Sequence, residues 1–183
     1  AERVSALAAA KGCSTADITV CVLERPRHQE MIAELRTTGA AIRLITDGDV
    51  AGIIHTAEAA KTGIDMYMGS GGAPEGVLAA AALKCMGGQV YGRLVFRNDD
   101  ERARARTMGI DDINKKFELE EMASGDVIVA ATGVTDGSLL DGVKFRGDFA
   151  ETESVVLRSK TGTVRRVKTC PLYPTGPADG RPS

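Results

Sequence analysis

Two arginines that flank a proline are the first residues of this sequence whose types and spacing could do chemistry. Arg25, Pro26 and Arg27 follow a short apolar run and precede a stretch with helical spacing. A guanidinium group offers a rigid fork of N–H donors that suits phosphate oxygens, and a helix N-terminus adds backbone N–H groups. The alternative is that both arginines are ordinary surface charges, and that His28 beside them lies at the surface or supports another residue.

Two carboxylates on either side of a glycine follow the second apolar run. Asp47, Gly48 and Asp49 form a turn whose oxygens can accept hydrogen bonds from sugar hydroxyls or hold a cation. An ordinary Asx turn explains the same residues, with Asp47 as the N-cap of the helix that follows. Both interpretations stay open from the sequence alone.

A glycine-rich segment, residues 69–76, follows the third apolar run. Its glycines, Gly72 among them, allow the backbone to approach a ligand closely. We expect Pro74 and Glu75 to be the first two residues of a helix, where the ionised Glu75 carboxylate can ligate Mg²⁺ or Mn²⁺. The alternative is that Glu75 only complements the helix dipole. The segment fits neither the GxGxxG fingerprint nor the P-loop.

The elements around these three clusters favour an α/β fold. Apolar runs alternate with helical stretches, which predicts strands over residues 18–23, 41–45, 64–68 and 89–96, with helices after Pro26, over about 50–60, and from the glycine-rich segment to Gly87. This order is typical of a mostly parallel sheet with flanking helices. Ligands bind outside the carboxyl ends of such strands, so we expect the three clusters to converge at one edge.

The remaining segments are expected to complete one α/β domain over residues 17–168. Residues 98–106 are strongly charged and predict a surface helix or loop, residues 127–132 a strand, and residues 154–167 a closing hairpin. Residues 1–16 are expected to form an N-terminal helix or linker. Residues 169–183 are rich in proline and glycine and are expected to be a flexible tail.

Composition excludes several classes of protein. The chain has 183 residues, of which 43% are hydrophobic and 26% charged, and this is ordinary globular composition. A net charge of -2 and the lack of tryptophan argue against nucleic-acid and anionic-membrane partners. No apolar run approaches the roughly 20 residues of a membrane helix, and the N-terminus shows no secretory signal. The 4 cysteines form no zinc or disulfide pattern, so we predict a cytoplasmic protein.

Taken together, the motifs resemble those of the class II fructose-1,6-bisphosphatases. The resemblance extends from about Asp17 to Val167 and is carried by several stretches in the same order, residues 22–28, 45–50, 71–77, 80–85, 131–135 and 152–160. The related bifunctional enzymes that also hydrolyse sedoheptulose-1,7-bisphosphate look similar over these stretches.

The resemblance implies the fold of the lithium-sensitive sugar phosphatases and a role in gluconeogenesis. The expected reaction is hydrolysis of the C1 phosphate of fructose-1,6-bisphosphate to fructose-6-phosphate with Mn²⁺ or Mg²⁺, and the complete enzyme is expected to be a homo-oligomer. By resemblance, residues 25–27 would hold the remote phosphate and residues 47–49 the sugar. Gly72 would contact the substrate, and Glu75 would be a metal ligand.

One departure limits what the chain is expected to do alone. The family's chains are nearly twice as long, and their N-terminal half supplies most of the acidic metal ligands. No acidic cluster in residues 1–13 could replace these ligands. The chain therefore resembles the C-terminal, substrate-binding half and is predicted to be inactive alone. A catalytically silent phospho-sugar-binding or regulatory module is the alternative, and an unrelated nucleotide-binding fold is disfavoured by the failed glycine fingerprint.

Overall fold

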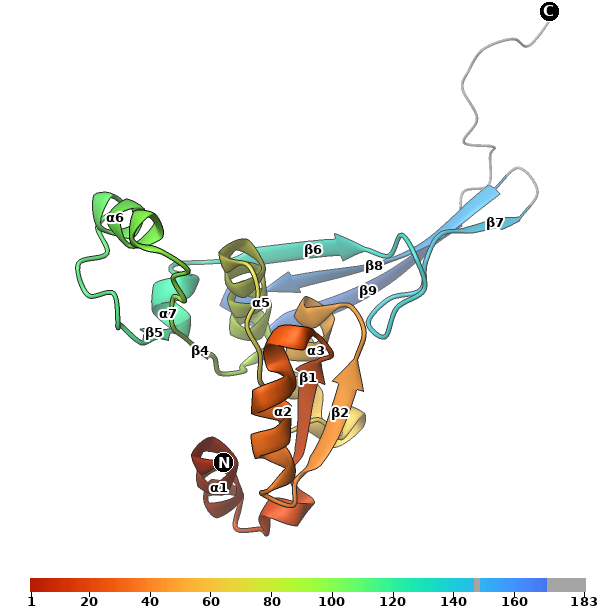
Figure 1. Ribbon diagram of the computed structural model, residues 1–183. Helices are drawn as coiled ribbons and strands as arrows, with labels where there is room; N and C mark the ends of the chain where they lie inside the picture. The colour runs from red at the N-terminus through yellow and green to blue at the C-terminus, as the bar shows by residue number, and fades with distance from the viewer. Residues whose placement is uncertain (147–148, 171–183) are drawn as a thin grey trace, which may run out of the picture.

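Three short parallel strands form the sheet that carries the predicted clusters (Figure 1). The computed structural model describes residues 1–146 and 149–170. Strand β1 (Thr19–Leu23) lies between β2 (Ala41–Ile45) and β3 (Met66–Tyr67) and runs parallel to both. Residues 20–23 are all buried, because a central parallel strand is covered on both faces. The continuous apolar run of the sequence is the signature of this burial.

Two helices cover one face of the parallel sheet. Helix α1 (Glu2–Lys11) is followed by a 3-10 turn, η1 (Thr15–Asp17), and α2 (Gln29–Arg36) follows a second such turn, η2 (Pro26–His28). Their apolar side chains share one core with β1, which contains Val4, Ala8, Ile18, Val20, Val22, Ile32, Leu35 and Ala40. The N-terminal segment is therefore a helix that packs directly on the α/β core.

The helix predicted over residues 50–60 is interrupted in the structure. It consists of α3 (Asp49–His55), the 3-10 turn η3 (Thr56–Glu58) and α4 (Ala59–Thr62). The backbone of Glu58 leaves the helical region, with φ -115° and ψ 39°. The Thr62 hydroxyl lies 2.8 Å from the carbonyl oxygen of His55 and 3.2 Å from that of Glu58, so it links the end of α3 to the start of α4. Gly63 ends the segment with a positive φ of 68°, which glycine adopts without strain.

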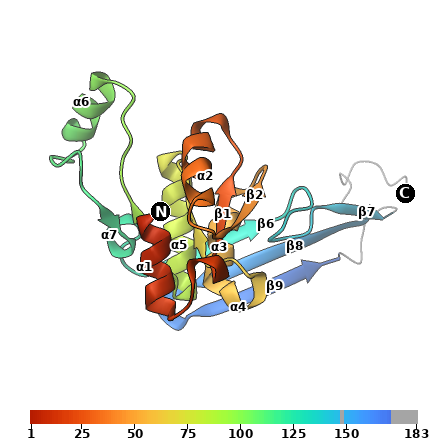
Figure 2. The same cartoon turned by 60° about the horizontal axis from the view of Figure 1, so that its bottom comes forward.

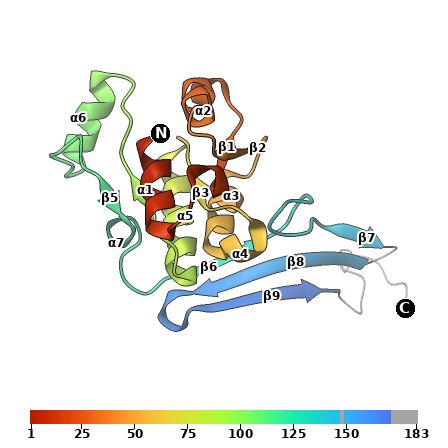
Figure 3. The same cartoon turned by 90° about the horizontal axis from the view of Figure 1, so that it is seen from below.

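A second sheet lies on the far side of helix α5 (Ala73–Met86). Strands β6 (Ile128–Thr132) and β7 (Lys144–Arg146) pair with one edge of β8 (Phe149–Arg158), and β9 (Thr163–Thr169) pairs with the other, all antiparallel. The predicted hairpin is thus confirmed and is longer than expected, with its turn at η4 (Ser159–Thr161). Figure 3 shows α3 and α5 between the parallel strands and the β8–β9 hairpin. Their shared core contains Ile54, Ala82, Cys85, Leu140, Val155 and Leu157.

The strand predicted over residues 89–96 is wrong as a member of the parallel sheet. Only β4 (Tyr91–Gly92) forms there, and it pairs antiparallel with β5 (Phe117–Glu118). The run is apolar, but Tyr91 is 60% exposed and Val95 76% exposed, so these side chains do not reach the core. The α/β class itself is confirmed.

The segment beyond β4 forms a peripheral lobe (Figures 1 and 2). It contains α6 (Asp99–Thr107) and α7 (Leu119–Met122). Asn98 caps α6, because its side chain accepts a hydrogen bond from the Glu101 backbone N–H at 2.9 Å. The charged run of the sequence is therefore a surface helix.

Two further expectations concern the chain end and the membrane. Of the tail predicted over residues 169–183, Thr169 closes β9, and residues 171–183 lie outside the described residues. The sequence showed no apolar run long enough for a membrane helix. Within residues 1–146 and 149–170, no helix has the length and apolar character to cross a bilayer. Cys21 and Cys85 are buried free thiols.

Candidate functional site

The carboxyl ends of the three parallel strands bring the predicted clusters to one edge of the sheet (Figure 1). The Glu24 N–H donates to the Ile45 carbonyl at 2.8 Å, and the Met68 N–H donates to the Cys21 carbonyl at 3.0 Å. These bonds extend the pairing of β1 with β2 and β3 to the residues where the polar clusters begin. The predicted convergence follows from this register.

The first and third clusters meet at Ser70. The Arg27 guanidinium donates twice to the Ser70 carbonyl, from Nε at 3.0 Å and from Nη2 at 2.9 Å. The Ser70 N–H donates to His28 Nε2 at 2.9 Å. The glycine-rich loop is therefore tied to the end of β1 by two side chains from a single turn.

The second cluster reaches the same loop through Asp49. A methyl group built on Gly71 would lie 3.1 Å from Asp49 Oδ2. The expected cap at Asp47 is wrong: the N-cap of α3 is Gly48, with φ 74°, while Asp47 Oδ1 accepts from the Gly48 N–H at 2.8 Å. The left-handed backbone of Gly48 places the helix start one residue later than a capping Asp47 would. Asp49 becomes the first residue of the helix.

The glycine-rich loop ends at the N-terminus of α5. Gly72 is its N-cap, so Pro74 and Glu75 are the second and third helical residues, one position later than predicted. A side chain on Gly72 would collide with the Glu75 carboxylate, which folds back over the loop. Gly72 and Glu75 are both exposed, so the carboxylate and the first N–H groups of the helix are open to a ligand.

Tyr67 is a residue of this edge that the sequence patterns missed. Burial raises the pKa of its phenol to about 12, and the neighbouring Asp49 carboxylate adds to this effect. Methyl groups built on Gly52 and Gly69 would meet the Tyr67 ring at 3.3 and 3.2 Å, so both glycines pack against it. The phenol stays protonated at neutral pH and supports the loop from below. An aromatic residue two positions before the glycine run is the signal that could have found it.

Arg25 and Pro26 lie apart from the loop. They line a groove of about 470 Å³ together with Glu24, Gln29, Ile32, Arg36 and Leu44. Arg25 Nη1 donates to the backbone carbonyl of Glu24 at 2.9 Å. The three residues predicted to act together are therefore divided, with Arg27 at the glycine-rich loop and Arg25 in the groove between α2 and β2.

The residues of this edge do not by themselves form a metal site. Within residues 1–146 and 149–170, no three His, Cys, Asp or Glu side chains are grouped closely enough to hold a metal ion. Glu75 can contribute a single carboxylate, whereas Mg²⁺ and Mn²⁺ prefer about six oxygen ligands in all. A metal ion at this edge would therefore need carboxylate or other oxygen donors besides Glu75.

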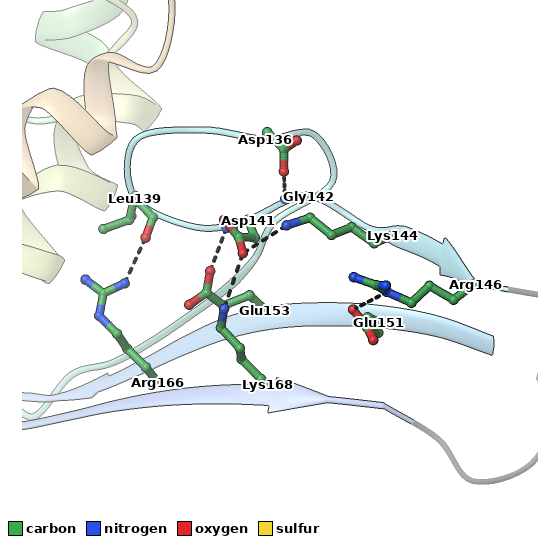
Figure 4. Close-up of polar contacts among 10 residues, drawn as sticks. All are labelled: Asp136, Leu139, Asp141, Gly142, Lys144, Arg146, Glu151, Glu153, Arg166 and Lys168. Carbon is green, nitrogen blue, oxygen red and sulfur yellow. Dashed lines mark hydrogen bonds and ion pairs between the residues drawn. The ribbon is translucent and has the colours of Figure 1, made fainter.

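A second polar cluster, where the loop after β6 meets β7, β8 and β9, is structural (Figure 4). Asp141 accepts from Lys144 Nζ at 3.1 Å and from Lys168 Nζ at 3.3 Å, and its N–H donates to Glu153 at 2.6 Å. The Gly142 N–H donates to Asp136 at 2.9 Å. These contacts fasten residues 133–142 to the sheet.

The fold and the residues at this strand edge together indicate a class of protein. An arginine, a carboxylate and a glycine-rich helix start gather at the carboxyl ends of parallel strands, which is typical of an α/β protein that binds a phosphorylated ligand. The sequence matches the family described as bacterial fructose-1,6-bisphosphatase, glpX-encoded, over residues 1–170. The chain belongs to this family.

Curated relatives agree with the family. The chain is 43% identical over 166 residues to the D-fructose 1,6-bisphosphatase class 2/sedoheptulose 1,7-bisphosphatase of Synechococcus sp. (strain JA-3-3Ab), covering 84% of this chain and 48% of that protein. It is 41% identical over 170 residues to the protein of the same name from Trichodesmium erythraeum, covering 86% of this chain and 49% of that protein. The chain spans about half the length of these relatives.

Proposed function

We propose that this chain is the substrate-binding half of a metal-dependent sugar bisphosphatase. The reaction would release the C1 phosphate of fructose-1,6-bisphosphate to give fructose-6-phosphate, as in gluconeogenesis, and sedoheptulose-1,7-bisphosphate is a second candidate substrate because the relatives' names include it. The observation that carries the proposal is the meeting of Arg27, Asp49 and the loop before Glu75 at one strand edge.

Arg27 is the proposed contact for the remote phosphate. Its Nε and one Nη2 hydrogen are used on the Ser70 carbonyl, and a guanidinium has five N–H donors, so three remain for a phosphate. Residues 47–49 would accept hydrogen bonds from the sugar hydroxyls. Arg25 and Pro26 would border the phosphate from the adjoining groove.

Glu75 is the proposed metal ligand of this half. When bound, Mn²⁺ or Mg²⁺ would neutralise charge on the scissile phosphate and activate the attacking water. Because the described residues hold no complete metal site, the other ligands would come from the part of the relatives that this chain does not span. Residues 17–168 would then be the substrate-binding unit, and this chain alone would release no phosphate.

The same strand edge also fits a second function. A catalytically silent phospho-sugar-binding or regulatory module needs the strand edge but no metal cluster. The two functions differ in what happens when the missing ligands are supplied, because only the enzyme half would then support hydrolysis.

Both functions require that the chain binds a sugar bisphosphate, and an NMR titration with fructose-1,6-bisphosphate tests this. We expect saturable shifts in the amides of residues 69–72, and weaker binding for Arg27→Ala by about 1.5–3 kcal/mol, the value of a charge-assisted hydrogen bond. Arg106→Ala is the matched control, because Arg106 is an exposed arginine on α6. Absence of saturable shifts, or equal weakening by both variants, would refute the assignment.

The compartment and the assembly are also proposals. We place the protein in the cytoplasm, and the support is that all 4 cysteines are free thiols, two of them buried. Homo-oligomer formation by the complete enzyme stays a prediction.

A further inference from the structure

His28 is the one polar or charged side chain that is buried within residues 1–146 and 149–170, with 2% of its surface exposed. It lies in η2, between the end of β1 and the glycine-rich loop. Its Nδ1 is 2.6 Å from the Leu23 carbonyl oxygen, and its Nε2 is 2.9 Å from the Ser70 backbone nitrogen and 3.1 Å from Ser70 Oγ. A buried imidazole therefore connects two segments 42 residues apart.

These contacts favour one tautomer of the ring. The Leu23 carbonyl oxygen can only accept, which favours a hydrogen on Nδ1. Nε2 faces both the Ser70 N–H, a donor at 2.9 Å, and the Ser70 carbonyl oxygen, an acceptor at 3.2 Å, and Arg27 already donates twice to that oxygen. The tautomer with its hydrogen on Nδ1 donates to Leu23 and accepts from Ser70, so it holds both neighbours at once.

We propose that His28 is a positioning residue that holds the glycine-rich loop in its substrate-binding geometry; this inference rests on the proposed function. Residues 69–72 contain three glycines and are exposed, so little else restricts their backbone. Ser70 is fixed at its N–H by His28 and at its carbonyl by Arg27. Fixing both ends of one residue sets the direction of the chain into Gly71 and Gly72.

Packing supports the same role. A methyl group built on Gly69 would lie 3.4 Å from His28 Cε1 and 3.2 Å from the Tyr67 hydroxyl oxygen. Gly69 therefore packs against both the imidazole and the phenol ring. Loss of the Nε2 acceptor would free the Ser70 N–H, while the Tyr67 contact and the Arg27 hydrogen bonds would stay in place.

The competing explanation is that His28 only completes the end of β1 through the Leu23 carbonyl. Two substitutions separate these roles. The amide nitrogen of Asn lies close to the position of Nδ1, so His28→Asn keeps a donor for Leu23 and loses the acceptor for Ser70. The longer side chain of Gln brings its amide oxygen close to the position of Nε2, so His28→Gln keeps the acceptor. His55→Gln is the control, because His55 is the only other histidine of the chain and lies in α3.

The first measurement uses the free protein and needs no ligand. Long-range ¹H–¹⁵N spectra should show His28 protonated at Nδ1 and unprotonated at Nε2. Hydrogen exchange of the Ser70 amide should be about tenfold faster in His28→Asn than in the wild type and in His55→Gln, as expected for the loss of one hydrogen bond. A ring protonated at Nε2 in the unsubstituted chain, or equal Ser70 exchange in His28→Asn and wild type, would overturn the proposal.

The second measurement is the affinity for fructose-1,6-bisphosphate. We expect about tenfold weaker binding for folded His28→Asn, with His28→Gln within about threefold of the wild type. Unchanged affinity in folded His28→Asn would overturn the role in binding. If the wild-type chain binds no sugar phosphate, the proposed function fails, and the tautomer and the Ser70 exchange still decide whether His28 holds the loop.

Discussion

Gly72 and Glu75 make the most direct test at the scale of single residues. Gly72 has φ -68° and ψ 149°, which alanine also adopts, so Gly72→Ala strains no backbone and acts only by displacing the Glu75 carboxylate. A suitable protein is a chimera, the Synechococcus relative with its matching segment replaced by this chain. We expect Gly72→Ala to reduce its release of phosphate from fructose-1,6-bisphosphate by at least tenfold.

Gly76→Ala is the control for Gly72→Ala. A methyl group there would make an ordinary contact of 3.6 Å with Met122 Cε, within helix α5. The change should raise the free energy of unfolding by up to about 1 kcal/mol and leave turnover unchanged. Equal turnover in both variants would show that the Glu75 carboxylate needs no particular position.

Asp141 is expected to make stability depend on pH. Hydrogen bonds from Lys144 and then Lys168 lower the pKa of its carboxyl below the usual 3.8. A lowered folded-state pKa means that the stabilisation is fully present above 3.8 and is lost as pH falls through the folded-state value. Asp141→Asn should therefore lower stability at neutral pH and have a smaller effect in strong acid. Urea unfolding at about pH 7 and about pH 2 checks this, and an equal difference at both pH values would contradict it.

At the scale of elements, the loop of residues 133–142 depends on the absence of a side chain at Gly142. A methyl group there would lie 2.5 Å from the Thr135 carbonyl carbon and 2.6 Å from the Asp136 nitrogen. We expect Gly142→Ala to lower the free energy of unfolding by roughly 1–3 kcal/mol, because backbone atoms would have to move. Gly137→Ala, whose methyl group would lie 3.7 Å from the Leu140 oxygen, is the control and should cost much less. Equal melting temperatures of the two variants would contradict this explanation.

The order of the elements was largely predictable from the sequence, because buried strands appear as apolar runs and helix ends are marked by glycines. The run ending at Leu23 is continuous where β1 is covered on both faces, and Gly63 and Gly87 stand where helices end with positive φ. The prediction of a core strand over residues 89–96 was wrong, because apolar character does not reveal which side chains reach a core. The interruption at Glu58 is a change of backbone angles within a helical pattern, and hydrophobic periodicity does not reveal it.

For the whole molecule, stability depends on α3 and α5 between two sheets (Figure 3). Leu157 of β8 is 1% exposed in that core, whereas Ile128 of the paired strand β6 is 68% exposed. Leu157→Ala should lower the free energy of unfolding by about 2–5 kcal/mol. Ile128→Ala should change it by about 0.5 kcal/mol or less. Similar effects of the two changes in chemical denaturation would contradict this layered core.

The candidate site was predictable only as far as strand ends allow. Parallel topology brings residues 25–27, 47–49 and 69–76 to one edge, and this was inferred from the order of elements. The division of Arg25 from Arg27 and the contact of His28 with Ser70 were not, because they depend on side-chain directions after the strands end. The chain spans about half the length of its relatives, so we propose that the strand edge is part of a larger site.

Turnover of the chimera with and without the Glu75 carboxylate tests the central claim most directly. We expect the chimera to release phosphate from fructose-1,6-bisphosphate with Mn²⁺, the 183-residue chain alone to release none, and Glu75→Gln in the chimera to lose most turnover while its melting temperature stays nearly unchanged. A Glu75 that only complements the helix dipole would cost about 0.3–1 kcal/mol of stability with no loss of rate. A folded Glu75→Gln chimera with normal turnover at saturating Mn²⁺ would contradict the claim.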